Sequence, residues 1–265
     1  MIDDLSCEGI KTVLSEALGD SIRVEILTKT DSTNTVVKKR ASCGDAEGLF
    51  VVAGEQTAGR GRLGRSFFSP DDTGLYMSLL LRPSITPEQS VLITTAAAVS
   101  VCEALEKVGA VGTAIKWVND VFLNDKKVCG ILTEGSFNPQ KGALDYVVLG
   151  VGINVYEPGD GFPPELQSIA GAVFKAEKEN LRNTIAAEFL NSFMGYYNTL
   201  DKRDFFALYT QKCFVIGKDI TIISSDKNTP AKALGLDENF GLLAELEDGS
   251  RVTLNSGEIS VRVKS

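Results

Sequence analysis

The spacing of apolar and polar residues at the start of the chain predicts a helix, a strand and a second helix. Ile10 to Leu18 has helical spacing that ends at Gly19, and Ile22 to Leu27 alternates as a strand does. Asp31 to Asn34 then offers side chains that can cap a helix expected over 36–41. Short polar residues are therefore expected where this strand ends.

Longer apolar runs predict a sheet with helices beside it. Strands are expected at Leu49 to Ala53, Leu75 to Leu81, Ala114 to Val118, Val121 to Leu123, Val128 to Leu132 and Tyr146 to Gly150. The polar turn at 124–126 makes a hairpin of the strands on either side of it. Pro87 opens a helix through about Lys107, because proline fits the first turn and the alanine-rich interior favours helix. Another helix is expected over 180–200.

The pattern changes near Cys213. From Ile220 onward the apolar runs are short and are separated by turns at 225–228, 237–239 and 248–249, which predicts a small antiparallel barrel. We therefore expect two domains, a larger one at 1–212 and the barrel at 213–265.

Composition and charge narrow the class of protein. A chain of 265 residues with 43% hydrophobic content is long enough for one sizeable core and a small second domain. The net charge of −8 argues against broad affinity for nucleic acids or membrane surfaces, since both need a basic face. The five cysteines form no C-x-x-C pair, which is typical of small core residues in a reducing cytosol; they are Cys7, Cys43, Cys102, Cys129 and Cys213.

Targeting signals and histidine are both missing from the sequence. The acidic start, Met1 to Asp4, lacks the basic and apolar regions of an export signal, and Ser90 to Leu105 is too short for the roughly 20 residues of a membrane span. A cytoplasmic protein is expected. The absence of histidine removes serine–histidine hydrolysis, cysteine–histidine chemistry and histidine-ligated metal sites together. Any chemistry must use lysine, arginine, carboxylates and a nucleotide-borne cation.

The segment from Gly54 to Arg65 interleaves glycines with Arg60, Arg62 and Arg65 directly after an expected strand. Glycine lets the backbone approach a ligand closely, and guanidinium groups are forked donors suited to phosphate or carboxylate. The segment, called the arginine loop below, therefore predicts a site for an anion. Its three like charges should repel one another when the site is empty, so we expect the loop to be mobile until an anion binds.

Two other interpretations of the arginine loop need a context that this sequence does not provide. Gly59 to Gly64 fits G-x-G-x-x-G, but the turn-rich stretch from Ser66 to Gly74 follows it instead of the helix of a dinucleotide fold. An RNA-binding arginine–glycine tract needs low-complexity surroundings, whereas apolar runs flank this loop on both sides.

Further polar blocks lie at the ends of expected strands, at Lys116 to Asp120, Lys126 to Leu132 and Gly150 to Asn154. Lysines, an Asn–Asp pair and glycines in these places are consistent with a sheet that forms the floor under a ligand. Taken alone, Lys126 and Lys127 would only solubilise a hairpin, as exposed lysines usually do.

The order of the blocks resembles that of the biotin protein ligase family. The matching blocks are Asp31 to Asn34, Gln56 to Arg65, Lys116 to Asp120, Lys127 to Leu132 and Gly150 to Asn154, with a further match at Gly257 to Ser260. The resemblance implies an α+β fold, with a class II synthetase-like catalytic domain around a central mixed sheet and a C-terminal SH3-like β-barrel. Too few residues precede Asp31 for the helix-turn-helix domain of many members, so the chain resembles the monofunctional branch.

The resemblance also implies a reaction in two steps. Biotin's carboxylate would attack the α-phosphate of ATP in the presence of Mg²⁺, and biotinyl-5′-AMP would then acylate one lysine of a biotin carboxyl carrier protein. Biotin and ATP would be substrates, with no tightly bound prosthetic group. The partner would be the carrier of a biotin-dependent carboxylase, without DNA or membrane, and the chain could form a homodimer.

Site residues follow from the same resemblance. Ser32, Thr33 and Asn34 would hold the ureido ring, and the biotin-binding set is Ser32, Thr33, Asn34, Gln56, Gly59, Arg60, Gly61, Arg62, Lys127 and Gly130. The catalytic residues would be Arg60, Arg62 and Lys127, and the nucleotide-binding set Arg62, Arg65, Phe67, Asn119, Asp120 and Asn154. No metal ligand is assigned. Many relatives have proline where this chain has Val118, which leaves the side-chain chemistry intact.

Two alternatives remain open at this stage. Lipoate or octanoate transfer would use the same fold, although the polar set at 32–34 favours a ureido-bearing ligand over a plain acyl tail, because buried polar groups need partners. A non-enzymatic nucleic-acid binder would place phosphates on the arginine loop, and its binding would weaken steeply with salt.

Overall fold

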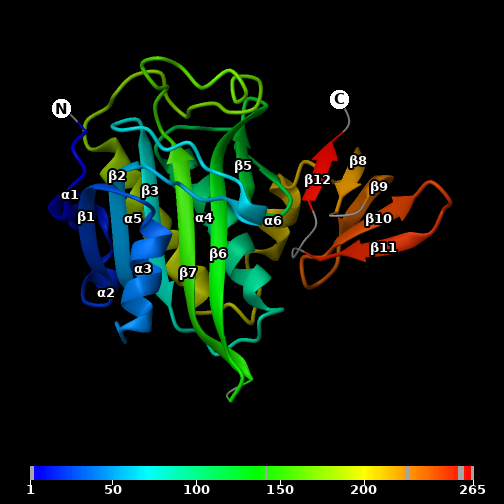
Figure 1. Cartoon of the computed structure of the whole chain (residues 1–265), viewed down its shortest axis with the longest axis horizontal. Coiled ribbons are helices and arrows are strands. Elements are labelled where there is room, and N and C mark those ends of the chain that lie inside the picture. The colour runs from blue at the N-terminus through cyan, green and yellow to red at the C-terminus, as the bar shows by residue number, and fades with distance from the viewer. Residues whose placement is uncertain (1–2, 141, 225–226, 256–259, 264–265) are drawn as a thin grey trace.

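The computed structural model describes residues 3–140, 142–224, 227–255 and 260–263. Its larger sheet has seven strands in the order β1-β2-β3-β7-β6-β5-β4 (Figure 1). These are β1 (Arg23–Thr30), β2 (Leu49–Gln56), β3 (Gly74–Leu81), β4 (Ala114–Lys116), β5 (Asp120–Leu123), β6 (Lys126–Asn138) and β7 (Ala143–Asn154). β1 and β2 run parallel and the other neighbouring pairs are antiparallel, so the central sheet is mixed as expected.

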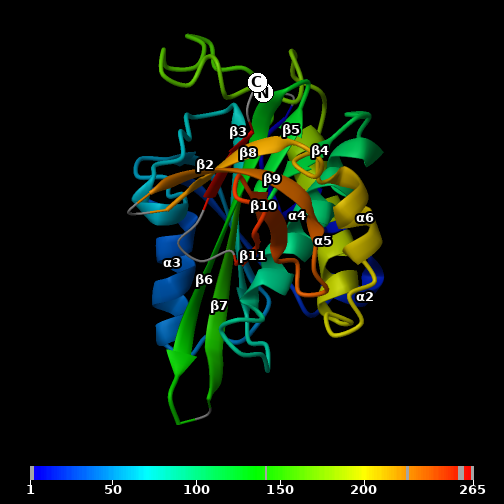
Figure 2. The same ribbon diagram turned by 90° about the vertical axis from the view of Figure 1, so that its right-hand side faces the viewer.

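Helices cover both faces of this sheet. α3 (Thr33–Ser42) lies on one face, and α4 (Ser90–Lys107) and α5 (Leu181–Tyr197) lie on the other (Figure 2). Side chains of β2 alternate between the two layers: Phe50 and Val52 belong to the large core with α4 and α5, whereas Leu49 and Val51 pack with α3. This two-residue period explains why the strand is a continuous apolar run, because both of its faces are buried.

The long apolar stretch over 90–105 forms the interior of α4, of which most residues are buried. A helix that is apolar on all sides needs burial on all sides, and α4 finds it between the sheet and α5. Among the described residues, no helix has the length and apolarity needed to cross a membrane.

The C-terminal part is a separate antiparallel sheet in the order β11-β10-β9-β8-β12. Its strands are β8 (Asp219–Ile223), β9 (Asn228–Leu236), β10 (Leu242–Leu246), β11 (Arg251–Leu254) and β12 (Ser260–Val263). Phe240, in the turn before β10, is fully buried against Phe205, Phe206 and Tyr209, with ring centroids 5.0 to 5.3 Å apart. Its carbonyl accepts a hydrogen bond of 2.8 Å from Trp117 Nε1. The α+β class and the small antiparallel unit are thus confirmed.

Several expected boundaries differ from the structure. The helix expected over 10–18 is two helices, α1 (Cys7–Val13) and α2 (Glu16–Gly19), because Leu14 is extended and Ser15 N donates to Asn191 Oδ1 on α5. α4 begins at Ser90, three residues after Pro87, and β4 ends at Lys116, where the Trp117–Val118 peptide is cis.

The sequence also predicts a boundary between the two parts of the chain and the burial of the cysteines. α6 (Phe206–Lys212) precedes β8. The domain boundary between residues 212 and 213 stays a prediction. Residues 257–259 of the expected block at 257–260 lie outside the described residues. All five cysteines are in described segments and are free thiols. Three of them are buried as expected, but Cys43 is exposed because it follows the last turn of α3, so the expectation of a core residue is wrong there.

Candidate active site

Two neighbouring cavities lie where the sheet meets the arginine loop. The larger, which we call the pocket, has a volume of about 370 Å³, and the smaller, which we call the slot, about 30 Å³. Arg60, Phe67, Gly130 and Leu132 line both of them. Of the expected residues, Ser32, Thr33, Asn34 and Gln56 line the slot, and Gly61, Arg62, Arg65, Asn119, Asp120, Lys127 and Asn154 line the pocket. Gly59 lines neither of these two cavities.

A chain of hydrogen bonds forms the polar wall of the slot. Gln56 Oε1, at the end of β2, accepts from Thr33 N at 2.9 Å and from Thr33 Oγ1 at 3.2 Å. Ser78 Oγ, on β3, lies 2.7 Å from Thr33 Oγ1 and 2.6 Å from Asn34 Oδ1. Ser32 is the N-cap residue of α3 but makes no side-chain capping bond, contrary to expectation. Gln56 instead accepts from the first N–H of the helix, that of Thr33.

Glycines form the floor of the slot. Gly130 on β6 pairs with Gly152 on β7, and an added Cβ at Gly152 would lie 2.6 Å from the ring of Phe67. At Gly150 an added Cβ would lie 2.1 Å from Asn34 Oδ1. Both contacts are shorter than van der Waals distance, so the side chains of Asn34 and Phe67 lie directly on the backbone of the sheet.

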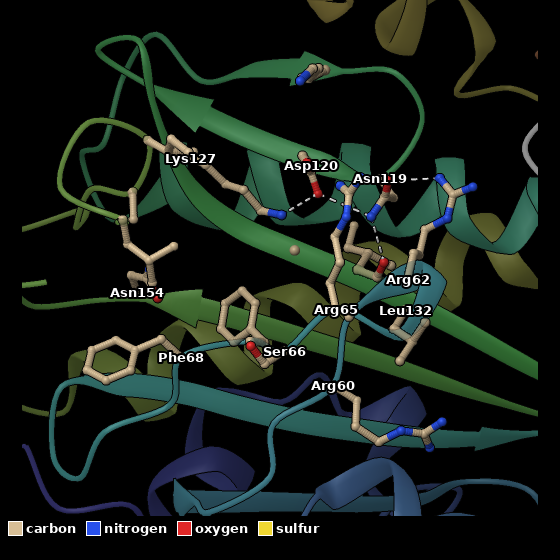
Figure 3. Close-up of a pocket in the computed structure, with 18 of the residues that line it drawn as sticks. Arg60, Arg62, Arg65, Ser66, Phe68, Asn119, Asp120, Lys127, Leu132 and Asn154 are labelled. Atoms are coloured by element: carbon tan, nitrogen blue, oxygen red, sulfur yellow. Dashed lines mark hydrogen bonds and ion pairs between the residues drawn. The ribbon is translucent and has the colours of Figure 1, made fainter. Parts of the chain in front are cut away.

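Charged side chains meet in the pocket around Asp120. Lys127 Nζ lies 2.7 Å from Asp120 Oδ1, which also accepts from Asn119 Nδ2 at 3.1 Å (Figure 3). Arg62 Nη1 donates to Asn119 Oδ1 at 3.0 Å, and burial lowers the pKa of the Arg62 guanidinium, partly offset by the charge of Asp120. Lys127 and Arg62 are therefore held in the pocket by neighbouring residues, Lys127 by Asp120 and Arg62 by Asn119.

The β5–β6 hairpin is what brings these groups together. Asn124 and Asp125 both have positive φ, 50° and 60°, which is the geometry of the tightest two-residue hairpin turns. The turn returns the chain so that Lys127 stands beside Asp120. Lys126 points elsewhere, and its Nζ donates to the carbonyls of Gln167 and Ser168, both at 2.9 Å. Both lysines therefore have specific partners, and neither serves only to solubilise the hairpin.

The arginine loop is closed by its own backbone. Gly61 N donates to Arg65 O at 2.7 Å and Phe67 N to Gly59 O at 2.9 Å, with a single 3₁₀ turn between them and no α-helix after it. Gly59 therefore helps to close the loop through the hydrogen bond that its carbonyl accepts from Phe67 N. Arg60 pairs with Glu134 at 2.9 Å, whereas Arg62 reaches Asn119, so the guanidinium groups have separate partners. The expected mobility of the loop stays a prediction.

Sequence reasoning missed several residues of this site. Ser78 and Glu134 complete the polar network, and a segment over 162–170 covers the pocket through Phe162, Leu166, Ile169 and Ala170. Lys127 N donates to Ile169 O at 2.8 Å, and Asn154 Nδ2 holds the segment at Gly171 O, 3.1 Å away. The signal for Ser78 was a small polar residue within a strand whose residues are otherwise mostly apolar.

Comparison with known proteins places the chain among the biotin and lipoate protein ligases. Residues 27–154 match the biotin/lipoate A/B protein ligase family, and residues 215–262 match the biotin protein ligase C terminal domain. The chain is 34% identical over 246 residues to the bifunctional ligase/repressor BirA of Bacillus subtilis, which covers 91% of this chain and 73% of that protein. It belongs to the biotin protein ligase family.

Two further relatives agree with this assignment. The biotin--[acetyl-CoA-carboxylase] ligase of Mycobacterium tuberculosis is 26% identical over 92% of this chain and 87% of its own length. The solved biotin protein ligase from Aquifex aeolicus in complex with biotin and ATP is 28% identical, with a TM-score of 0.76, and the match covers 91% of this chain and 99% of that one.

Proposed function

We propose that this protein is an ATP-dependent biotin protein ligase. It forms biotinyl-5′-AMP from biotin and ATP and then transfers biotin to one lysine of a biotin carboxyl carrier protein. Its membership of the family supports the proposal, as does the likeness to a ligase solved with biotin and ATP.

One observation carries the proposal most directly: the polar slot opens beside the cationic pocket, and both share Arg60, Phe67 and Gly130. A ligand with a polar ring in the slot would extend its acid toward the cations of the pocket. The assignments are those the sequence resemblance implies: the ring on Ser32, Thr33 and Asn34, the acid near Gln56, Arg60, Arg62 and Lys127. The nucleotide would lie against Arg62, Arg65, Asn119, Asp120 and Asn154, with Phe67 as an apolar wall.

The first step joins two anions. A carboxylate oxygen of biotin attacks the α-phosphorus of ATP, the bond from that phosphorus to the bridging oxygen breaks, and pyrophosphate leaves. Repulsion between the anions opposes their approach, and Arg62 and Lys127 would offset it. A hydrogen bond to a charged group contributes about 1.5 to 3 kcal/mol, so two that strengthen in the transition state correspond to roughly a hundredfold or more in rate.

The second step transfers the acyl group. The amine of the carrier lysine attacks the acyl carbon of the mixed anhydride, the bond from that carbon to the phosphate oxygen breaks, and AMP leaves. The segment over 162–170 and the arginine loop would keep water from the anhydride before the lysine arrives. The chain contains no histidine, so the proton of the amine must leave by another route.

Mg²⁺ would accompany ATP. The described residues contain no cluster of three or more histidine, cysteine or acidic side chains for a metal ion, but Asp120 is a carboxylate that lines the pocket. Mg²⁺ commonly uses one or two carboxylates together with substrate phosphates, so this residue set fits it. Asp120 would hold the ion beside the phosphates, where its charge would neutralise theirs.

The partner and the setting belong to the same proposal. The partner would be the carrier of a biotin-dependent carboxylase, in the cytoplasm and without DNA, and the chain could act as a homodimer. Lipoate remains the alternative substrate, because the matched family includes lipoate ligases. The uncharged polar side chains that line the slot favour a ligand whose ring has polar atoms to pair with them; they are Ser32, Thr33, Asn34 and Gln56.

Transfer to a carrier tests the function. The protein is incubated with ATP, Mg²⁺, a carboxyl carrier domain and either biotin or lipoate, and the mass of the carrier is measured. A gain of one biotinyl group, lost when ATP is omitted or when the carrier lysine is replaced by arginine, is expected. An unchanged carrier mass with biotin would count against the proposal, and a gain with lipoate alone would favour the alternative.

A further inference from the structure

Glu134 stands on β6 beside the slot, two residues beyond the last residue of the Lys127 to Leu132 block. Gly130, Leu132 and Glu134 share one face of the strand, since alternate residues of a strand do, and the first two line the slot. An acidic side chain therefore stands on the ligand face of the sheet. Only 19% of it is exposed.

The carboxylate of Glu134 is shared by two side chains of the proposed binding site. Oε2 accepts from Asn34 Nδ2 at 2.9 Å and from Arg60 Nη1 at 3.0 Å, and Oε1 lies 2.9 Å from Arg60 Nη2. Arg60 thus makes a forked contact with both oxygens, the geometry in which a guanidinium is held most firmly by a carboxylate.

This contact determines where Arg60 points. In Figure 3 its guanidinium turns away from Lys127, Asp120 and Arg62, although Arg60 lines both cavities. Lys127 contacts Asp120 and Arg62 contacts Asn119. In this structure, the positive charge of Arg60 is therefore committed to a carboxylate of the protein itself.

We propose that Glu134 is a positioning residue that serves as the counter-ion of Arg60 until a ligand carboxylate displaces it, an inference that rests on the function proposed above. A carboxylate can replace another carboxylate on a guanidinium without leaving it unpaired, whereas a neutral ligand of the same shape cannot. Binding of the acid is therefore an exchange of partners. The strength of the Arg60–Glu134 pair therefore determines how much more tightly the site binds the acid than its neutral derivative.

The exchange also has a consequence for the first step of the reaction. Once the carboxylate has become a mixed anhydride, its acyl carbon bears no negatively charged oxygen, so the guanidinium loses that partner at the acyl end. The Arg60 guanidinium then pairs with Glu134 again. Arg60 is thereby withdrawn from the acyl group before the second step.

Substitution by glutamine separates the charge of Glu134 from its contact with Asn34. Glu134→Gln keeps an oxygen that can accept from Asn34 Nδ2 but removes the counter-ion of Arg60, whereas Glu134→Ala removes both. Glu188→Gln is the matched control, because Glu188 is 20% exposed and pairs with Lys107 Nζ at 2.5 Å on α4 and α5, away from both cavities.

The experiment measures dissociation constants by calorimetry for biotin and for its neutral methyl ester. Glu134→Gln should bind biotin about two- to fivefold more tightly, the range expected for releasing a partly exposed ion pair, with the ester unchanged. Glu134→Ala should also weaken binding of the ester, because Asn34 Nδ2 loses its bond to Glu134, and Glu188→Gln should change the binding of neither ligand. Thermal melts verify that each variant is folded.

The same measurement in an Arg60→Gln background tests whether the effect runs through Arg60. There Glu134→Gln should no longer tighten biotin. Unchanged or weaker biotin binding by folded Glu134→Gln, or a tightening that persists without Arg60, would overturn the inference. If Glu134→Gln does not fold, Glu134→Asp replaces it, because aspartate keeps the charge but reaches less far. Glu134→Asp should bind biotin more tightly than the wild type by a smaller factor, and unchanged biotin binding would overturn the inference. Wild-type protein that binds neither ligand would refute the proposed function itself.

Discussion

Lys127 Nζ lies 2.7 Å from Asp120 Oδ1 across the β5–β6 hairpin. The two side chains come from neighbouring strands joined by a turn of two residues, so their separation is set by local structure. Because the carboxylate holds the ammonium in the pocket before any ligand arrives, little side-chain ordering remains to be done when a substrate anion binds.

Removing Lys127 or Arg62 from the pocket should affect the chemistry and spare the fold. Lys127→Ala and Arg62→Ala should each lower adenylate formation by roughly ten- to a hundredfold, since each removes a charge-assisted bond to the reacting anions. Pyrophosphate release under single-turnover conditions measures this step. Lys107→Ala, which removes a lysine of a surface ion pair, should be near wild type. An unchanged release rate in either pocket variant would show that the assigned role is wrong.

A methyl group at the floor of the slot should disturb both binding and stability. At Gly150 it would lie 2.1 Å from Asn34 Oδ1, so Gly150→Ala should destabilise the protein by about 1 to 3 kcal/mol and weaken biotin binding. Gly195 on α5 has no atom within 4 Å of the same position, and Gly195→Ala should stabilise by about 0.4 to 1 kcal/mol. Urea unfolding measures the free energy of unfolding of the two variants, and equal changes in both would contradict this prediction.

The buried ion pair of Asp3 and Arg182 should contribute strongly to stability. Both side chains are at most 3% exposed, and Arg182 Nε lies 3.2 Å from Asp3 Oδ2 while its Nη1 donates to Gly74 O at the start of β3. Arg182→Met leaves the carboxylate buried without its charge partner, at a cost of about 3 to 5 kcal/mol. Arg251→Met breaks an exposed pair and should cost less than about 1 kcal/mol. Denaturant unfolding distinguishes the two.

The thiols should react in an order set by their burial. Cys43 is exposed, whereas burial raises the pKa of Cys102 to about 11 and that of Cys213 to about 12, so those two are protonated as well as covered at neutral pH. Labelling of the native protein should show one rapid thiol, removed by Cys43→Ser. All five should react in denaturant. Rapid labelling that survives Cys43→Ser would contradict this order.

Asp45 should add to the loss of stability in acid. A hydrogen bond from Arg40, assisted by Arg23, lowers the pKa of Asp45 below its usual 3.8. Because the folded-state pKa is the lower one, its contribution is present above about pH 4 and is lost as the pH falls through the folded-state value. The melting temperature should therefore fall less steeply from about pH 6 to pH 2 for Asp45→Asn than for the wild type. Identical slopes would show that Asp45 contributes nothing.

Elements with strong local signals were predictable. The buried strand β2, the hairpin at 124–126 and the helix α4 follow from residue periods and turn chemistry, which act over a few neighbouring positions. The break between α1 and α2 was not predictable, because Ser15 N is satisfied by Asn191 from far along the chain. The hydrogen bond from Thr33 N at the start of α3 to Gln56 on β2 was not predictable either, because the two residues are far apart in the chain.

The sequence by itself determined which residue types are available and in what order: an arginine loop after a strand, lysine and Asn–Asp blocks at strand ends, and no histidine at all. That order was enough to indicate the family. Only the tertiary structure decided which carboxylate pairs with Arg60, namely that of Glu134. Residue 134 lies 74 positions from Arg60, and no local pattern encodes a contact that strand pairing creates across the sheet.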